Sequence, residues 1–396
     1  MSDAGRLTEV GGAFLRLGLV SFGGPVAHIG YFRREFVERR HWLDDAEFAD
    51  TVALCQLLPG PASSQVAFAL GMRRAGLAGA LTASIAFMLP SAVLMILFAY
   101  GIALVGDPSA AGWLHGLKVA AVAVVAVALW GMAASLCPDW KRRIMAAAAA
   151  SVVLLLQGPW AQVGVILLWA FIGTTIRFRV ARSEAQAAAG DVGGRGRAAA
   201  ALAVFGILLI ALPVLSAFTG SKSVALFDSF YRSGALVFGG GHVVLPLLRS
   251  ELVPRGLVGD SAFLAGYGAV QAMPGPLFTF AGYLGTVAVG GTHAWAGGIM
   301  ALLAIFLPGW LLVAGAYPFW HRLRPRSWFQ GAVRGASAAV VGILFAALCS
   351  PLIPEAIHKL ADVLAAAVAV VLLVRFKVPQ WLLVVLLAAA GQWILR

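Results

Sequence analysis

The six residues QLLPGP at positions 56–61 return as QAMPGP at positions 271–276, and this pair decides how the chain is read. Both copies lie inside long apolar segments. Proline removes a backbone donor and clashes with the preceding helical turn, and glycine admits dihedral angles that other residues avoid. We therefore predict that each Pro-Gly-Pro breaks a membrane helix and opens a new half-helix.

The composition predicts a membrane protein. Of 396 residues, 61% are hydrophobic and only 12% are charged, whereas a soluble domain carries about 25% charged residues. Apolar runs such as 78–100, 119–134 and 360–374 have the length of helices and lack the alternation of barrel strands. We predict an all-α polytopic membrane protein. The charged first ten residues do not resemble a cleavable signal peptide, so the first membrane segment is expected to direct insertion.

The net charge of +12 has two compatible interpretations. One is the usual excess of basic residues in cytoplasmic loops, and the other is a basic vestibule that attracts anions. A nucleic-acid partner is not expected, because no soluble domain presents a basic face. Cys55, Cys137 and Cys349 are scattered and are read as buried small hydrophobes. The histidines lack metal-ligand spacing, and no phosphate loop or nucleophile elbow occurs, so we expect no metal, no cofactor and no enzyme.

The second half of the chain repeats the first. Phe22-Gly23-Gly24 returns 216 positions later, Pro59-Gly60-Pro61 returns after 215, and the prolyl motif at 87–90 returns after 218. A nearly constant offset indicates a gene duplication. We predict a first repeat over 10–178, a linker with an extra membrane helix over 179–224, and a second repeat over 225–395.

Basic residues suggest that the repeats are inverted. The apolar segment 76–105 follows Arg73-Arg74, whereas its counterpart at 294–320 precedes the basic residues of 322–326. Under the positive-inside rule the two run in opposite directions. A single first span over 11–31 and thirteen segments in all then give an N-terminus inside and a C-terminus outside. The basic loop 33–40 would lie outside and violate the rule, unless the first broken segment re-enters the membrane.

The two breaks are the first candidates for a binding site. Inverted repeats place their site at the shared interface, and the first N–H groups of a half-helix carry the positive end of a dipole. Neutral donors suit an oxyanion that must be bound and then released. The alternative is that each Pro-Gly-Pro only marks a kink or a packing point. The candidate substrate-binding residues here are Gln56, Pro59, Gly60, Pro61, Ser63, Ser64, Gln65, Gln271, Pro274, Gly275, Pro276 and Thr279.

Two further sets of candidates come from the repeat. Phe-Gly-Gly allows close approach of a helix or an ion, and an arginine within a span either serves function or snorkels to the interface. These residues are Phe22, Gly23, Gly24, Phe238, Gly239, Gly240, Arg16 and Arg232. Candidates for a proton relay are His28, His242, Glu35 and Glu251. Their alternatives are simply hydrogen-bonded histidines and structural salt bridges.

These motifs together resemble the chromate ion transporter family. The motifs that resemble the first domain of the family are FGGPVAH (22–28), RREFV (33–37), WL (42–43), LLPGP (57–61) with Gln65, and FMLP (87–90). The motifs that resemble the second domain are FGGG (238–241), LPLL (245–248), PGP (274–276) and IFLP (305–308). The likeness covers about 10–180 and 225–395. Trp42 and Gln65 are matched by Val258 and Phe280, so the halves would not contribute equally.

The resemblance is to the long, two-domain form of the family. It implies a protein of the bacterial plasma (inner) membrane, in contact with lipid, that exports chromate using the chemiosmotic gradient, with sulfate as a competing mimic. The rivals are a transporter of sulfate or another tetrahedral oxyanion such as molybdate, and an anion channel. Direction, coupling ion and oligomeric state stay open, with a homo-dimer as one arrangement.

Overall fold

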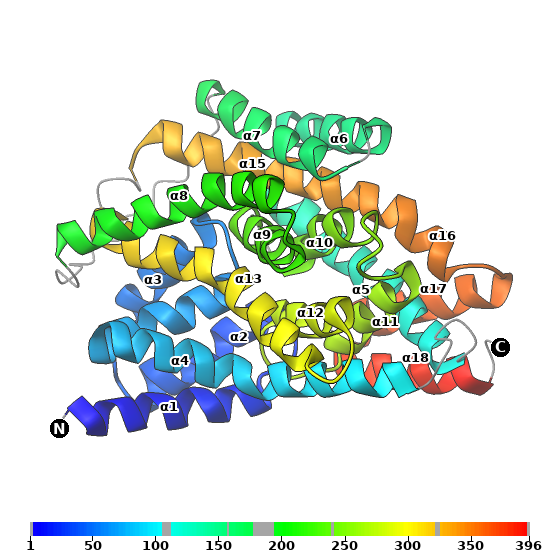
Figure 1. The fold of residues 1–396 in the computed structure, drawn as a ribbon, viewed down its shortest axis with the longest axis horizontal. Helices are drawn as coiled ribbons and strands as arrows, with labels where there is room; N and C mark the ends of the chain where they lie inside the picture. Colours follow the sequence, from blue (N-terminus) through cyan, green and yellow to red (C-terminus); the bar gives the residue numbers. More distant parts are fainter. Residues whose placement is uncertain are drawn as a thin grey trace.

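The computed structural model describes residues 3–104, 112–156, 158–176, 194–238, 241–320 and 325–393. Within these ranges every regular element is a helix (Figure 1), which confirms the prediction of an all-α chain. Five of the helices described are long and apolar enough to cross a membrane, namely Ala62–Leu104, Gly112–Leu136, Arg195–Thr219, Ala294–Phe319 and Ser327–Ala356.

The first half of the chain contains seven α-helices and one π-helical turn among its described residues. They are α1 (Asp3–Val20), α2 (Gly24–Arg33), η1 (Arg34–Arg39), α3 (Asp45–Leu57), α4 (Ala62–Leu104), α5 (Gly112–Leu136), α6 (Trp140–Leu155) and α7 (Pro159–Thr175). Helix α4 is interrupted at Ala75 and Gly76, whose dihedral angles are not helical. It therefore consists of two helices joined by a tight turn.

The second half follows α8 (Arg195–Thr219) in the same order. Its helices are α9 (Lys222–Ala235), α10 (Val244–Leu252), α11 (Asp260–Val270), α12 (Phe280–Val289), α13 (Ala294–Ala316), α15 (Ser327–Ala347), α16 (Ile353–Ala356), α17 (Leu360–Val374) and α18 (Gln380–Trp393). Short helical turns are η2 (Gly241–Val243), η3 (Leu277–Thr279), η4 (Tyr317–Phe319) and η5 (Leu348–Leu352). The start of α1 and the end of α18 lie at opposite ends of the long axis (Figure 1).

The first two helical pairs are hairpins that return to the face on which the chain begins. Glu9 in α1 accepts hydrogen bonds from Arg40 (3.4 Å) and Arg74 (2.7 Å), and Glu47 in α3 binds Arg73 (2.6 Å). The start of α1, the connector after α2 and the turn within α4 therefore lie together. We call this the N-terminal face.

This arrangement corrects two expectations. Residues 11–31 do not form one span, because the chain reverses between α1 and α2 at Gly23 and Gly24, whose φ angles of +98° and +75° suit glycine. The basic loop 33–40 does not lie opposite the N-terminus, because Glu9 holds Arg40 on the N-terminal face. The segment that contains the first break therefore begins and ends on the same face.

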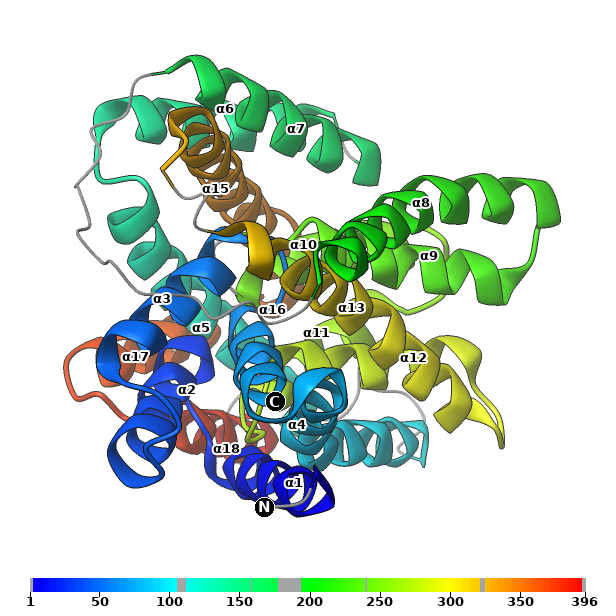
Figure 2. The same ribbon diagram turned by 90° about the vertical axis from the view of Figure 1, so that its left-hand side faces the viewer.

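One helix from each half of the chain runs antiparallel to the other where the two halves meet. Tyr100, near the end of α4, accepts a hydrogen bond from the backbone N–H of Trp295 (3.0 Å) at the start of α13. Tyr317, just after α13, accepts one from Arg73 (3.1 Å) in the turn within α4. Each helix thus ends beside the start of the other, the two are in contact, and both also contact α12, which Figure 2 shows beside α13. The second half of α4 and α13 run in opposite directions.

The later helices of each repeat pack on the other repeat. Helix α15 lies against α6 and α7, as Figure 1 shows, and α5 lies against α17 and α18. Small residues allow this close packing, as is usual between membrane helices. A Cβ atom on Gly116 would collide with the carbonyl of Leu387, and one on Gly335 would collide with the carbonyl of Trp169. The repeats are therefore interlocked.

Gly116→Ala is expected to destabilise the protein by about 3 kcal/mol, because overpacking against a backbone carbonyl cannot be relieved by a side-chain rotation. Gly131→Ala in the same helix is the matched control, since a Cβ there meets nothing within 4 Å. It should be neutral or stabilising by up to about 1 kcal/mol. Thermal unfolding in detergent, followed by gel filtration, compares the two. Equal melting temperatures would contradict the tight α5–α18 contact.

Candidate functional site

The first Pro-Gly-Pro breaks a helix and forms a hydrogen bond to the second repeat. Helix α3 ends at Leu57 and α4 begins at Ala62, so the motif is not helical. Gly60 has a φ of +124°, and its N–H donates to the carbonyl of Val237 at 2.7 Å. Val237 directly precedes the second Phe-Gly-Gly.

The second Pro-Gly-Pro makes the corresponding bond to the first repeat. Helix α11 ends at Val270, and Gly275 has a φ of +94°. The N–H of Gly275 donates to the carbonyl of Ser21 at 2.8 Å. Ser21 directly precedes the first Phe-Gly-Gly and lies 216 positions before Val237. The two breaks thus exchange equivalent hydrogen bonds between the repeats.

Each break also packs against a helix of the other repeat, and both of these helices contain the proline of the repeated motif at 87–90 and 305–308. A Cβ on Gly60 would lie 3.4 Å from the Cα of Gly309, and one on Gly275 would lie 3.0 Å from Ser91 Oγ. Gly309 follows Pro308 and Ser91 follows Pro90. Gly241 lies near the first glycine motif, since a Cβ there would be 3.8 Å from the ring of Pro25. The described parts of four motifs therefore meet at one place.

Buried polar side chains flank the first break. Gln65 Nε2 donates to the carbonyl of Pro59 at 2.7 Å and braces the broken segment. Ser63, Ser64 and Gln65 are all buried. Ser64 Oγ and Gln65 Oε1 have no hydrogen-bond partner among the described residues. Because buried polar atoms are nearly always hydrogen-bonded, these two atoms are candidates to contact a ligand or water.

The second break has a similar brace and a buried histidine. Thr279 Oγ1 donates to the carbonyl of Pro276 at 2.8 Å. His28 Nε2 lies 3.1 Å from the carbonyl of Ser21 and must donate, because a carbonyl only accepts. The same carbonyl receives the N–H of Gly275. His28 Nδ1 has no partner in the described part of the chain, so this histidine can still bind a proton or a donor.

The other predicted proton carriers have specific partners. His242 Nδ1 lies 2.6 Å from the hydroxyl of Tyr267, four residues before Gln271. Glu35 binds Arg40 (2.7 Å) and Arg39 (3.1 Å) in the connector on the N-terminal face. Burial would raise the pKa of Glu35, but the hydrogen bonds and charges of the two arginines outweigh it and hold the pKa below its ordinary value. A carboxylate kept ionised in this way is a poor proton acceptor near neutral pH.

The two matched arginines lie in different surroundings. Arg232 is buried and pairs with Asp228 (2.8 Å) and Glu251 (2.7 Å), and its guanidinium also lies over the ring of Trp160. Arg16 is exposed on α1. The structure therefore brings Arg232 together with Glu251 and does not bring Arg16 into an equivalent cluster.

The remaining residues predicted around the breaks are the four prolines and the two glutamines. Pro59, Pro61, Pro274 and Pro276 form the breaks themselves. Gln271 is buried, whereas its counterpart Gln56 is exposed.

The Phe-Gly-Gly motifs contain the other predicted residues, which are two phenylalanines and the glycines that follow them. Phe22 and Phe238 are half-buried, and Phe22 packs against Trp381. Gly239 and Gly240 lie outside the described residues.

The sequence prediction did not single out several residues that contribute here. Ser21 supplies the shared carbonyl, Ser91 and Gly309 face the breaks, and Asp228 pairs with Arg232. Asp228 could have been found, because an acid four residues before an arginine on a helix is a signal for an ion pair. The carbonyl of Ser21 could not, because any residue provides a carbonyl.

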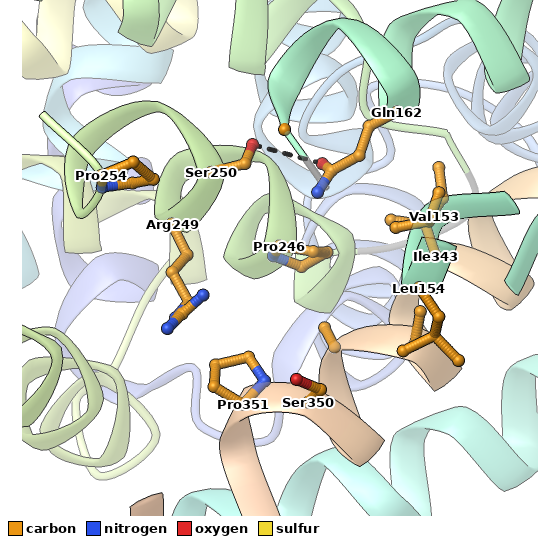
Figure 3. A pocket seen from close by; sticks show the side chains of 13 residues that line it. Val153, Leu154, Gln162, Pro246, Arg249, Ser250, Pro254, Ile343, Ser350 and Pro351 are labelled. Atoms are coloured by element: carbon orange, nitrogen blue, oxygen red, sulfur yellow. Dashed lines mark hydrogen bonds between the residues drawn. The ribbon is translucent and has the colours of Figure 1, made fainter. Parts of the chain in front are cut away.

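A cavity of about 130 Å³ lies apart from the breaks, between α6, α7, α10 and the end of α15 (Figure 3). Its polar lining includes Arg249, Ser250 and Gln162, and Ser250 Oγ donates to Gln162 Oε1 at 3.4 Å. Most of its other lining side chains are apolar. Arg249 is held by Asp260 at the start of α11 (2.6 Å).

Comparison with known proteins identifies the family. The model of the chromate transporter family matches twice, over residues 8–174 and 224–392. The chain belongs to the chromate transporter family. This confirms the resemblance seen in the motifs and agrees with a multi-pass membrane protein. A comparison with solved structures found no significant match.

Relatives of the chain cover most of its length. A chromate transport protein of Pseudomonas aeruginosa is 29% identical over 84% of this chain and 77% of its own. One of Cupriavidus metallidurans is 26% identical over 92% and 87%. A probable chromate transport protein of Synechococcus elongatus is 25% identical over 96% and 93%. The similarity therefore includes both repeats.

Proposed function

We propose that this protein is a secondary active transporter that exports chromate across the bacterial inner membrane. Membership of the chromate transporter family and the names of its relatives support chromate as the substrate. The observation that carries the site is the exchanged pair of bonds from Gly60 to Val237 and from Gly275 to Ser21. It joins two broken helices from different repeats next to buried polar atoms without partners.

Chromate suits this arrangement chemically. It is a tetrahedral dianion with four acceptor oxygens, and helix N-termini, hydroxyls and a protonated imidazole all donate to such a group. The hydroxyl of Ser64 is a donor beside the first break, and His28 Nδ1, beside the second, becomes a donor when it binds a proton. Because the breaks contribute neutral donors rather than fixed charges, the anion can be released after it has been bound.

The exchanged bonds suggest how binding and movement are coupled. In the described state the amides of Gly60 and Gly275 are occupied by carbonyls of the other repeat. An anion that takes either amide must release Val237 or Ser21. Binding would then loosen one repeat from the other, and discontinuous helices at a repeat interface are the usual place for such a change.

The orientation follows from charge. We propose that 10–178 and 225–395 are inverted repeats joined by 179–224, with the N-terminus in the cytoplasm. Arg40 and Arg74 pair with Glu9, and Arg73 pairs with Glu47, on the N-terminal face, and basic residues favour the cytoplasm. A negative interior favours export of a dianion, by about 2.3 kcal/mol per charge for each 100 mV. His28, His242 and Glu251 are the candidates to carry a coupled proton.

The test is flux of radiolabelled chromate in proteoliposomes that contain the purified protein in known orientation. We expect chromate to leave the side of the N-terminal face, faster with a negative potential on that side, and to be slowed by excess sulfate. Collapsing the pH gradient while the potential is clamped separates a coupled transporter from a channel. Flux equal to that of empty vesicles would refute chromate transport, and faster flux of sulfate or molybdate would reassign the substrate.

A further inference from the structure

Lys118 in α5 is a buried cation that the proposed site does not use. Its relative exposure is 7%, and its ammonium group has one hydrogen bond, to Ser261 Oγ at 3.4 Å. Among the described residues no carboxylate lies within ion-pair distance of it. Lysine is almost never buried without a partner, and an ionisable residue within a membrane protein is a candidate functional residue. The ammonium can still donate two further hydrogen bonds.

The ammonium lies at the first turn of α11. This helix of 11 residues begins after Gly259, which has no side chain to cap the first N–H groups. The first residue, Asp260, turns its carboxylate to Arg249 (2.6 Å). The second residue, Ser261, faces Lys118. Uncapped amides, a hydroxyl and an ammonium thus gather at the first turn of α11, and all three donate to anions.

An acidic residue that contacts α5 is already engaged with other partners. One turn before Lys118, His115 lies 2.9 Å from the carboxylate of Asp362. The other oxygen of Asp362 accepts from the backbone N–H groups of His358 (2.9 Å) and Lys359 (3.2 Å). This carboxylate is therefore not the counterion of Lys118.

Lys118 also lies between the second break and the start of α11. A Cβ on Gly268, three residues before Gln271, would collide with the carbonyl of Leu117, so the backbone of Lys118 lies close to the break. Its side chain then extends along α11 as far as Ser261. An anion held by the ammonium would lie beside the helix that leads from the break.

The repeat provides a comparison within the same molecule. Gly116 and Gly335 are matched in α5 and α15, which places Ser337 opposite Lys118, and Ala46 corresponds to Ser261. Neither of these residues can provide a positive charge. The positions in the other repeat that match Lys118 and Ser261 therefore carry no positive charge, and in this respect the two repeats differ.

We propose that Lys118, Ser261 and the first turn of α11 form a second binding site for the transported tetrahedral oxyanion, between the helix breaks and the far face. This proposal rests on the proposed function. An anion leaving the breaks would exchange their neutral donors for a full positive charge. The Arg249–Asp260 pair keeps the acidic side chain away from the anion and fixes the start of α11.

The experiment measures binding and transport in parallel. Equilibrium binding of radiolabelled chromate, sulfate and molybdate to purified protein is compared for the wild type, Lys118→Gln, Lys118→Arg and Ser261→Ala. Loss of one charge-assisted hydrogen bond should raise Kd and KM by about tenfold in Lys118→Gln. Ser261→Ala should raise them less, and Lys118→Arg should retain most of the affinity. Lys141→Gln removes an exposed lysine of α6 and should change nothing.

The outcomes separate this proposal from the proposed function. Wild-type Kd and KM in Lys118→Gln would overturn the second site and leave chromate transport intact. Wild-type protein that carries no chromate, but binds sulfate or molybdate through Lys118, would overturn the proposed function and keep the site. If none of the three anions binds, both fall. If Lys118→Gln does not fold, wild-type affinity in Ser261→Ala overturns the site.

Discussion

Alanine at Gly60 or Gly275 is expected to lower the rate of chromate transport by about a hundredfold, as a misplacement of about 1 Å does in a positioned site. Both glycines have positive φ angles, +124° and +94°, which strain an alanine by about 1–3 kcal/mol. The added methyl would also lie 2.7 Å from Gln65 Nε2 in one case and 3.0 Å from Ser91 Oγ in the other. Each change therefore shifts an amide away from Val237 or Ser21.

Gly290→Ala is the matched control, because Gly290 has a φ of +64° but no atom within 4 Å of its added Cβ. It carries the backbone strain without disturbing the breaks. Initial rates in proteoliposomes, normalised to inserted protein, compare the variants. Since both bonds join the same two repeats, the double variant should lose less than the product of the single effects. Gly60→Ala and Gly275→Ala that transport as well as Gly290→Ala would contradict the site.

The all-helical fold and the places of the breaks could be predicted because their signals are local. Long apolar runs require helices in a membrane, and a Pro-Gly-Pro interrupts a helix whatever surrounds it. The ends of α3 at Leu57 and α11 at Val270 lie where the motifs predicted interruptions. The repeat could be predicted for a different reason: several motifs share one offset.

The path of the chain between the breaks could not be predicted from hydropathy. Residues 11–31 have the length and composition of a span, yet the chain turns back between α1 and α2 at Gly23 and Gly24. A span and a hairpin of two short helices are equally apolar. Only long-range contacts, such as those of Glu9 with Arg40 and Arg74, distinguish them.

The surroundings of matched residues were also beyond prediction. Arg16 and Arg232 occupy equivalent positions, but Asp228 is matched by Gly12, so only the second arginine has an acid one turn before it. The sequence treats the two as a pair because the offset is the same. Their different burial depends on which helix of the other half covers them, and sequence spacing does not specify this.

Arg232→Gln is therefore expected to destabilise the protein by about 3–5 kcal/mol, the usual effect of removing one partner from a buried ion pair. The side chains of Arg232, Asp228 and Glu251 are 6%, 3% and 5% exposed. Without the guanidinium, Glu251 would keep an ion pair with Arg255, which is 39% exposed, and Asp228 would have no ion-pair partner among the described residues. Arg16→Gln at the equivalent exposed position should change stability by no more than about 0.5 kcal/mol.

Thermal unfolding in detergent measures this difference, and a second substitution identifies its cause. If the effect comes from unpaired negative charge, Asp228→Asn should restore part of the stability lost in Arg232→Gln, because it removes one of the two carboxylates that the arginine neutralised. Equal melting temperatures for Arg232→Gln and Arg16→Gln would contradict a buried network. Chromate transport that stays low after stability is restored would instead give Arg232 a part in moving the anion, because its charge would then matter beyond its ion pairs.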